Sequence, residues 1–347
     1  MRIRKNILLT FDYELFLGKR SGSVQKCMIE PTNELLKILK KNNAKAIFFI
    51  DTTYLAQLES VSANHPIAKK DLDTIINQLK EIVNQGHYIF HHLHPHWLDA
   101  VYLENSNEWN LENTTRFAIF NITELERDEL FAYSTNFLTS IYKNVGSELF
   151  PDAYRAGGLF IEPFSCFKTH FEKYGIHYEF SVVPGEKKEG TDLFYDFSSI
   201  QVNKPYSFKD DLTVEDPEGK LIEFPISKIE IKGLTKVLNS VYYRINKKSL
   251  NTMPFGDGLS VGSKINSNKD KKKLTDYLKF ELAISIEMLN PALLPSYKRI
   301  IAKNEFIHFL SHPKLLSKGS LKELDKLLAN SREKYLIEYD FKKMVTQ

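Results

Sequence analysis

Short apolar runs alternate with helical stretches along this chain, and that alternation limits its possible folds most strongly. The runs have the length and composition of strands buried on both faces, and they lie at residues 6–11, 46–50, 88–91, 153–156 and 306–310. Apolar residues recur with helical spacing at residues 31–40, 69–85, 123–143, 272–290 and 321–330. Strand–helix–strand units of this kind form parallel sheets with right-handed crossovers. The sequence therefore predicts an α/β fold, either layered or closed into a barrel.

The pattern loosens at residues 183–270, where Gly, Pro, Lys and Asp mix with short strand-like pieces at 221–226 and 228–232. A chain of 347 residues can form one compact domain with an insertion or two domains. Because the segment has the character of an insertion or cap, we predict a single domain over residues 1–347.

Composition argues against several partners and compartments. The net charge of +3 is too small to indicate a nucleic-acid or membrane partner. Cys27 and Cys166 lie far apart and in no metal or redox spacing, which favours a reducing compartment. The first apolar run is short and is broken by Asp12 and Glu14, unlike a signal peptide, and no later run has membrane-spanning length. We therefore expect a cytoplasmic protein.

Histidine is strongly clustered in one short segment. Five of the ten histidines fall within ten residues: His87, His91, His92, His94 and His96. Two imidazoles four residues apart can face the same way in a helical turn, and imidazole is a common zinc ligand. Any one of the five could be a surface or packing residue, but the cluster as a whole favours a metal site.

Two carboxylates follow the first apolar run directly. Asp12 and Glu14 are two residues apart, so on extended chain they point to the same side. In a shared cleft they would raise each other's pKa, which suits one general base and one metal ligand. The competing interpretation is a helix N-cap or a turn acid.

An arginine and a histidine end two further strands. Arg155 precedes Gly157 and Gly158, so backbone could approach a ligand there while the guanidinium orients a carboxylate. A structural salt bridge is the alternative. His312 follows the last predicted strand, where an acid or base can reach a cleft, although packing or capping is also possible. His308, inside the strand, is expected to be a core histidine.

Taken in order, these pieces resemble the motifs of the polysaccharide deacetylases of the NodB homology superfamily, carbohydrate esterase family 4. That family has a Thr-Phe-Asp-Asp motif, a Gly-His pair before His-Ser/Thr-x-x-His, an arginine motif and an apolar run ending in a histidine. The similar segments here are Thr10-Phe11-Asp12-Tyr13-Glu14, Gly86-His87, His92-Leu93-His94-Pro95-His96, Tyr154-Arg155-Ala156-Gly157-Gly158 and Phe309-Leu310-Ser311-His312-Pro313.

The resemblance implies a fold, a cofactor and a set of roles. The fold would be a deformed (β/α) barrel with fewer than eight strands, and the cofactor a divalent metal ion, usually zinc. The implied metal ligands are Glu14, His92 and His96, and the implied catalytic residues are Asp12, Arg155 and His312. The remaining clustered histidines, His87, His91 and His94, would be bystanders or outer neighbours of the site.

The chain departs from the family pattern at the second aspartate, a metal ligand that is Tyr13 here. A tyrosine with its high pKa is a poor replacement. We expect Glu14 to reach the ion instead and Asp12 to act as base oriented by Arg155, with Asp12 as a ligand the open alternative. The residues expected to line the substrate cleft are Tyr195, Asp196 and Tyr206.

The resemblance implies removal of an acetyl group from an N-acetylated sugar, during assembly or modification of a cell-surface polysaccharide. A cytoplasmic location would favour a nucleotide-linked or lipid-linked intermediate as substrate. Two alternatives remain. One is another metal-dependent C–N hydrolysis, such as deformylation or opening of a cyclic amide. The other is a member that binds carbohydrate without catalysis, which the loss of the second aspartate favours.

Overall fold

A computed structural model describes residues 6–18, 20–112, 115–190, 194–201, 203–246, 249, 251–259 and 279–329. Its centre is an eight-stranded sheet in which every pairing is parallel except that of β10 with β11. From one edge to the other the strands are β10 (Tyr206–Phe208), β11 (Leu221–Glu223), β7 (Tyr178–Glu179), β6 (Ala153–Ala156), β3 (Tyr88–Leu93), β2 (Ile47–Asp51), β1 (Asn6–Tyr13) and β14 (Phe306–Ser311).

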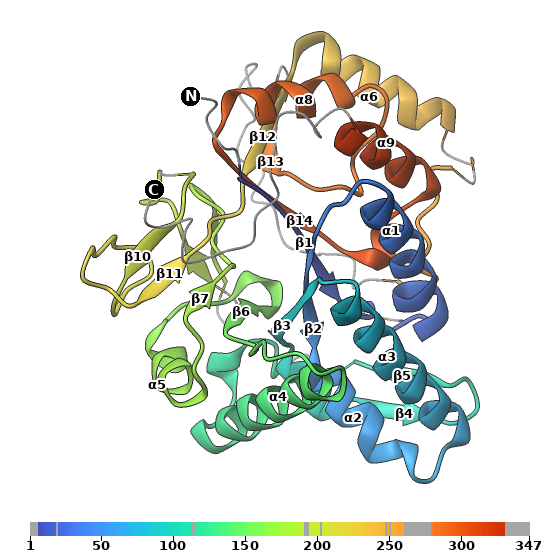
Figure 1. Ribbon diagram of the computed structural model, residues 1–347, viewed down its shortest axis with the longest axis vertical. Helices are drawn as coiled ribbons and strands as arrows, with labels where there is room; N and C mark the ends of the chain where they lie inside the picture. The colour runs from blue at the N-terminus through green and yellow to red at the C-terminus, as the bar shows by residue number, and fades with distance from the viewer. Residues whose placement is uncertain are drawn as a thin grey trace.

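Helices surround this sheet on its outer side (Figure 1). They are α1 (Glu30–Lys41), α2 (Thr52–Ser62), α3 (Pro66–Asn84), α4 (Glu124–Asn144), α5 (Ser165–Tyr174), α6 (Gly233–Asn246), α8 (Leu294–Lys303) and α9 (Lys318–Ala329). Three small antiparallel pairs complete the fold: β4 (Val101–Leu103) with β5 (Glu108–Asn110), β8 (Lys187–Lys188) with β9 (Tyr195–Asp196), and β12 (Lys228–Lys232) with β13 (Lys279–Ala283). None of the described helices combines the length and the apolar character needed to cross a lipid bilayer.

Each sheet strand is buried on both faces, and its alternate residues belong to different cores. On β1, Ile7, Leu9 and Phe11 pack outward in the cluster formed with α1, α3, α8 and α9, whereas Leu8 belongs to an inner cluster. The inner cluster draws on most strands of the sheet and consists of Leu8, Ile47, Phe49, Phe90, Ala153, Tyr178, Phe180, Phe224 and Phe306. Because side chains alternate along a strand, the polar residues Thr10 and Asp12 lie on the same inner side as Leu8.

The chain after β11 brings the two edges of the sheet together. The backbone N–H of Ser227 donates to His308 O on β14 (3.0 Å), and Ile284 N donates to Ser227 O (2.8 Å). These bonds curl the sheet into an incomplete barrel, which confirms the predicted (β/α) barrel type. The expectation of fewer than eight strands is corrected, because the short antiparallel β10 adds an eighth strand at one edge.

The insertion predicted at residues 183–270 contributes to the sheet itself. Within it, β11 pairs in parallel with β7, and β10 pairs with β11. The segment also contains β8, β9, β12 and α6. The single domain over residues 1–347 stays a prediction.

The helix predicted at residues 272–290 is wrong over residues 279–283, which form β13 paired antiparallel with β12. Isolated helical spacing was outweighed by tertiary pairing, because β12 buries Ile229 and Ile231 on one side and leaves Lys228 and Glu230 toward solvent. Residues 284–290 are irregular, and residues 272–278 lie outside the described part of the chain.

Two buried glutamates face each other at one side of the barrel. Glu179 on β7 and Glu223 on β11 are register partners, and both are 0% exposed. Glu223 Oε1 accepts a bond from the backbone N–H of Val182 (3.2 Å). Burial and the neighbouring charge of Glu179 raise the pKa of Glu223 well above its usual range. The Glu223 carboxyl is therefore held protonated at pH values where an ordinary glutamate is ionised.

We predict that Glu223→Gln makes the protein less sensitive to rising pH. A carboxyl whose pKa is raised on folding contributes its full stability below its unfolded pKa, and that contribution is lost as pH rises toward the folded pKa, by at most about 1.4 kcal/mol per pH unit. Gln stays neutral throughout. Urea denaturation at a series of pH values above about 5 should show the free energy of unfolding falling more steeply for the wild type than for the variant. Parallel pH profiles would contradict the assignment.

Candidate metal and acid–base site

Polar side chains from several strands meet at one end of the barrel. Most come from strand ends or the residues just beyond them, whereas Thr10 and His308 lie further back in their strands. They are Thr10, Asp12 and Glu14 from β1, His92 and His94 from β3, Arg155 from β6, and His308 and His312 from β14. The carboxyl ends of parallel strands are the usual place for the active site of a barrel.

Arg155 is completely buried, with a side chain that is 0% exposed. Its Nη1 donates to Asp12 Oδ1 (2.6 Å), and its Nε donates to the carbonyl of Phe180 (3.0 Å). The guanidinium also lies 4.2 Å from the ring centre of Phe49, in cation–π geometry. The predicted orientation of Asp12 by Arg155 is thus present as a buried, charge-assisted hydrogen bond.

The other guanidinium nitrogen, Nη2, donates to Thr10 Oγ1 (2.7 Å) and to His308 Nε2 (2.8 Å). Since Nε2 of His308 accepts, its Nδ1 carries the proton and donates to the carbonyl of Phe224 (2.8 Å). Burial and the charge of Arg155 hold the pKa of His308 well below its usual range, which keeps this ring neutral. His308 is a core histidine as expected, and it also anchors the arginine.

Asp12 is almost completely buried, and its free oxygen faces two imidazoles. Asp12 Oδ2 lies 3.8 Å from His92 Nε2 and 3.7 Å from His312 Nε2. Burial acts to raise the pKa of Asp12, but the charges of Arg155, His92 and His312 together outweigh burial and lower it. The carboxylate therefore stays ionised, as a general base or ligand must.

Glu14, His92 and His94 form a cluster that could hold a metal ion, with one donor atom of each within 4.8 Å of the others. Glu14 Oε2 lies 2.7 Å from His94 Nε2 and 3.3 Å from His92 Nε2, and the two Nε2 atoms are 3.0 Å apart. The His92 Nδ1–H donates to the carbonyl of Arg155 (2.8 Å), so Nε2 is the ring nitrogen left for a ligand.

The donor set of this triad fits a divalent cation. Two imidazole nitrogens and a carboxylate oxygen converge, and the buried Glu14 Oε2 faces both nitrogens. Burial alone would lower the pKa of His92, yet the carboxylates of Asp12 and Glu14 raise it to about 9. The local field therefore favours positive charge at Nε2, where a metal ion would bind.

The structure brings His94 to this triad, although the sequence pointed to His96. The register of the family motif selected positions 92 and 96, but His92 is on β3 and His94 stays extended (φ −120°, ψ 90°), so these two share a side. His96 lies in the short 3₁₀ helix that follows and stacks on Phe117 (5.5 Å between ring centres). Both ring nitrogens of His96 are buried without a partner among the described residues. Its role as a ligand stays a prediction.

Gly157 gives His94 the room that it occupies. A Cβ at position 157 would lie 2.5 Å from the carbonyl of Leu93 and 2.6 Å from His94 Nδ1, closer than any tolerated contact. The first glycine after Arg155 thus allows a histidine ring to approach the backbone, rather than a bound ligand as the sequence suggested.

Lys314 is a buried cation that sequence reasoning missed. Its Nζ donates to Glu14 Oε1 (2.8 Å) and to the carbonyl of Leu15 (2.6 Å), and it lies 5.0 Å from the ring centre of Phe16. Burial would raise the pKa of Glu14, but Lys314 and the two histidines of the triad hold it well below its usual range. Lys314 follows His312 by two residues, and that proximity was the only available signal.

His312 is the most accessible member of the site, with a side chain that is 23% exposed. Its Nδ1 lies 3.3 Å from Glu287 Oε1, and its Nε2 lies 3.7 Å from both Asp12 Oδ2 and Glu14 Oε1. Burial acts to lower the pKa of His312, whereas Glu287, Asp12 and Glu14 together raise it. Glu287 orients this ring. The sequence predicted only a helix for the segment that contains Glu287 and indicated no function for it.

Tyr13 faces away from the site. Position 13 is odd-numbered on β1, so its side chain points to the helices, and its hydroxyl donates to Gln78 Oε1 on α3 (2.6 Å). Gln78 in turn donates to the carbonyl of Ile29, before α1 (2.9 Å). Glu14, one residue further, points to the opposite, inner side and therefore lies beside His92 and His94.

Two further clustered histidines, His87 and His91, have structural partners, and their place outside the ligand set stays a prediction. The ring nitrogens of His91 lie 2.7 Å from Ser134 Oγ and 2.6 Å from the carbonyl of Pro151. Nδ1 of His87 accepts from the backbone N–H of Ala46 (3.1 Å).

The three residues expected to line the substrate cleft have other contacts. The hydroxyl of Tyr206 donates to the carbonyl of Leu212 (2.6 Å), and Asp196 pairs with Lys187 (2.9 Å). Tyr195 of β9 is buried against the rings of Phe160 and Phe197. Contact of these three residues with substrate stays a prediction.

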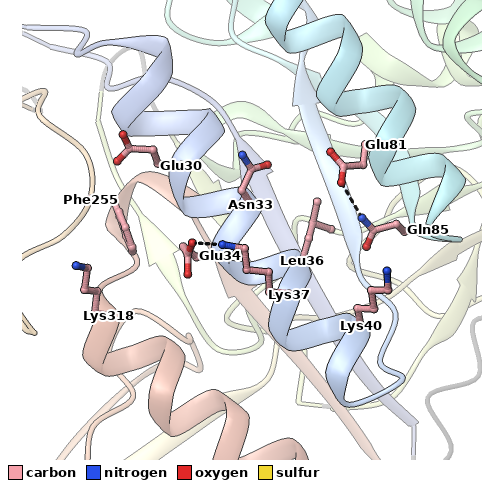
Figure 2. A pocket seen from close by; sticks show the side chains of 10 residues that line it. All are labelled: Glu30, Asn33, Glu34, Leu36, Lys37, Lys40, Glu81, Gln85, Phe255 and Lys318. Atoms are coloured by element: carbon pink, nitrogen blue, oxygen red, sulfur yellow. Dashed lines mark hydrogen bonds and ion pairs between the residues drawn. The ribbon is translucent and has the colours of Figure 1, made fainter.

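A cavity of about 670 Å³ lies elsewhere, along α1 and beside the end of α3 (Figure 2). Charged side chains line it, among them Glu34 paired with Lys37 and Glu81 bonded to Gln85. None of its lining residues belongs to the strand-end site, so this cavity is separate from the metal and acid–base residues.

Comparison with known proteins agrees with the motifs. Residues 2–137 match the model of the polysaccharide deacetylase family, which confirms the predicted resemblance over this part of the chain. No curated protein matches.

Several solved structures are similar in shape at low identity. An allantoinase is 12% identical, with 97% of this chain and 88% of that one covered and a TM-score of 0.47. A polysaccharide deacetylase from Bacillus cereus is 14% identical, with 96% and 91% covered and a TM-score of 0.40. A family 4 carbohydrate esterase from Streptomyces lividans is 16% identical, with 52% and 62% covered and a TM-score of 0.30.

The first prediction from this geometry separates His94 from His96. His94→Ala should weaken divalent-metal affinity at least about tenfold, because it removes an atom of the triad, whereas His96→Ala should change it less. Gly157→Ala should resemble His94→Ala because its Cβ displaces the ring. Competition with a chromophoric chelator measures all three affinities. A larger loss in His96→Ala than in His94→Ala would restore the ligand set expected from the sequence.

A second prediction concerns Lys314. Lys314→Met leaves the Glu14 carboxylate buried without its cation, so the metal-free protein should lose about 3–5 kcal/mol of unfolding free energy. Lys322→Met, at an exposed position on α9, should lose little. Denaturant titration of both variants in the presence of chelator tests this. Equal and small losses would mean that Lys314 does not compensate Glu14.

Proposed function

Residues 2–137 match the polysaccharide deacetylase family, and from this premise we propose that the protein removes the acetyl group from an N-acetylated sugar by metal-dependent hydrolysis. The observation that supports this most directly is the juxtaposition of Asp12, held ionised by Arg155, with the triad of Glu14, His92 and His94. A base, a cation site and an exposed imidazole together are what hydrolysis of an amide requires.

The triad would hold the divalent ion, and zinc suits its two imidazoles and one carboxylate. When bound, such an ion supplies positive charge that polarises the acetyl carbonyl and acidifies a nearby water. The Arg155 carbonyl orients the His92 ring for this role, and Lys314 fixes the far oxygen of Glu14.

Asp12 is placed to accept the proton of the attacking water. Its Oδ1 is occupied by Arg155, so only Oδ2 faces the imidazoles and the mouth of the site. Because Arg155 cannot be deprotonated, it keeps Asp12 ionised before the step and orients it throughout.

His312 is placed to protonate the leaving amine. Its ring is the most accessible of the site, and Glu287 accepts from Nδ1–H, which directs Nε2 toward Asp12. This arrangement resembles a histidine oriented by a carboxylate in other acyl-transfer sites. Proton uptake from water at Asp12 and delivery at His312 would complete amide cleavage with acetate and a free amine as products.

The proposed substrate is a carrier-linked sugar of cell-surface polysaccharide assembly, and the proposed location is the cytoplasm. Cys27 and Cys166 are both free thiols, which favours a reducing compartment and supports this location. A nucleotide-linked or lipid-linked N-acetyl sugar would be available there, whereas finished wall polymer would not.

The proposal predicts acetate release that requires metal and is lost in His92→Ala. Purified protein treated with chelator and reloaded with zinc should release acetate from N-acetylglucosamine oligomers or carrier-linked forms. His92→Ala should reduce the rate by at least about a hundredfold, since the cation site loses a ligand. His65→Ala, away from the site, should retain the rate.

Full acetate release by His92→Ala would contradict the assignment. Formate from an N-formyl sugar, or ring-opening of a cyclic amide, in place of acetate would move the reaction to another C–N hydrolysis at the same site. Tight metal binding with no hydrolysis of any of these substrates would favour the carbohydrate-binding alternative.

A further inference from the structure

The residue that follows β3 belongs to the triad, yet it has no partner among the described strands. The pairing of β3 ends at His92 on the β2 side and at Leu93 on the β6 side. His94 stays extended for one more residue, and the 3₁₀ helix Pro95–Asp99 follows directly. Because a buried backbone N–H is rarely left without an acceptor, a group outside the sheet must hold His94 in place.

Thr53, the second residue of α2, supplies that group. The backbone N–H of His94 donates to Thr53 Oγ1 (3.2 Å), and Thr53 is 0% exposed. The two residues are 41 positions apart in sequence, so this bond connects the start of α2 to the chain just beyond β3. Loss of a buried acceptor is unfavourable for the N–H that it leaves behind, and the backbone at residue 94 would shift to find another.

The start of α2 is itself fixed by Asp51. This residue ends β2 and caps α2, with Oδ1 accepting from the backbone N–H of Tyr54 (3.2 Å). Its Oδ2 accepts from the indole N–H of Trp97 (2.7 Å), and the backbone N–H of Trp97 donates to the carbonyl of His94 (3.1 Å). Both backbone groups of His94 are therefore held by residues that meet at the start of α2.

The ring of His94 is confined from another direction. Gly157 leaves the space that Nδ1 occupies, while Nε2 lies 2.7 Å from Glu14 Oε2. Since separate elements fix the backbone and the ring, a shift of the backbone at residue 94 would move Nε2 away from Glu14 and His92. The Thr53 hydroxyl thus helps to set the distances within the triad.

We propose that Thr53 is a positioning residue of the candidate cation site, which holds the backbone of His94 where its Nε2 completes the triad. Thr53 acts through His94 and is not a ligand itself. The inference rests on the proposed function, since it concerns the metal site that the proposed reaction requires. It goes beyond that function because position 53 lies outside every motif segment on which the family resemblance rests.

Thr52 provides a matched control in the same helical turn. It is also 0% exposed, but its Oγ1 donates to Ser134 Oγ on α4 (2.8 Å). Replacement of either threonine by valine keeps the branched shape of the side chain and removes one buried hydroxyl. The two variants should therefore be destabilised to a similar extent, whereas only Thr53→Val removes a contact of His94.

Cobalt titration of the metal-free, full-length protein tests the inference without any measurement of hydrolysis. The visible absorption band of bound Co²⁺ depends on the identity and geometry of its ligands. Thr53→Val should weaken Co²⁺ affinity about tenfold and change this band, whereas Thr52→Val should leave both as in the wild type. Thr53→Ser keeps the acceptor oxygen and should retain the wild-type affinity and band. Thr53→Ala provides the same comparison in case Thr53→Val does not fold.

A double-mutant cycle measures whether Thr53 acts through His94. In the His94→Ala background, Thr53→Val should cause no further loss of Co²⁺ affinity, because the ring that Thr53 positions is absent. Additive losses in the double variant would overturn the inference, as would a loss in Thr52→Val equal to that in Thr53→Val. Either result would mean that Thr53 contributes only to general packing.

The remaining outcomes separate this inference from the proposed function. Tight Co²⁺ binding by the wild type, with the same affinity and band in Thr53→Val, would contradict the positioning role and leave the metal-dependent reaction standing. Absence of Co²⁺ binding by the wild type would contradict the metal site itself and overturn both.

Discussion

The buried guanidinium of Arg155 is the interaction on which the rest of the site depends. A cation inside a barrel is costly unless its charge is compensated and its N–H groups have acceptors. Here Asp12 supplies the charge, while Thr10, His308 and the carbonyl of Phe180 supply acceptors. These partners come from separate strands, so one side chain connects the inner faces of β1, β6 and β14 and fixes the position of the Asp12 carboxylate.

The backbone of Arg155 also positions a residue of the candidate cation site. The carbonyl of Arg155 accepts from Nδ1 of His92, which directs Nε2 toward Glu14 and His94. Lys314 balances Glu14 from the other side. The site therefore holds two buried carboxylates, each paired with its own cation. In the proposed function Glu14 binds the metal ion and Asp12 takes the proton.

Much of the fold could be predicted, because a strand buried on both faces is a short continuous run of apolar residues, which is recognisable in the sequence. The alternation of apolar runs and helices indicated an α/β fold, either layered or closed into a barrel, and the family resemblance implied the barrel. The motifs indicated Asp12, Arg155, His92 and His312, which the structure brings together. The prediction of helix at 279–283 failed because pairing with β12 outweighed local spacing. The cleft-lining role of Tyr195, Asp196 and Tyr206 rested on resemblance alone.

The sequence by itself determined which residues lie at the strand ends and which face of the sheet each one occupies, because successive side chains of a strand point to opposite faces. That alternation places Glu14 inward and Tyr13 outward. Only the tertiary structure decided the rest. His94 joins the triad because β3 stays extended past position 92, and Lys314 reaches Glu14 across 300 residues of sequence because β14 lies beside β1. Contacts between distant positions depend on the order of the strands in the sheet. The spacing of residues along the sequence does not determine that order.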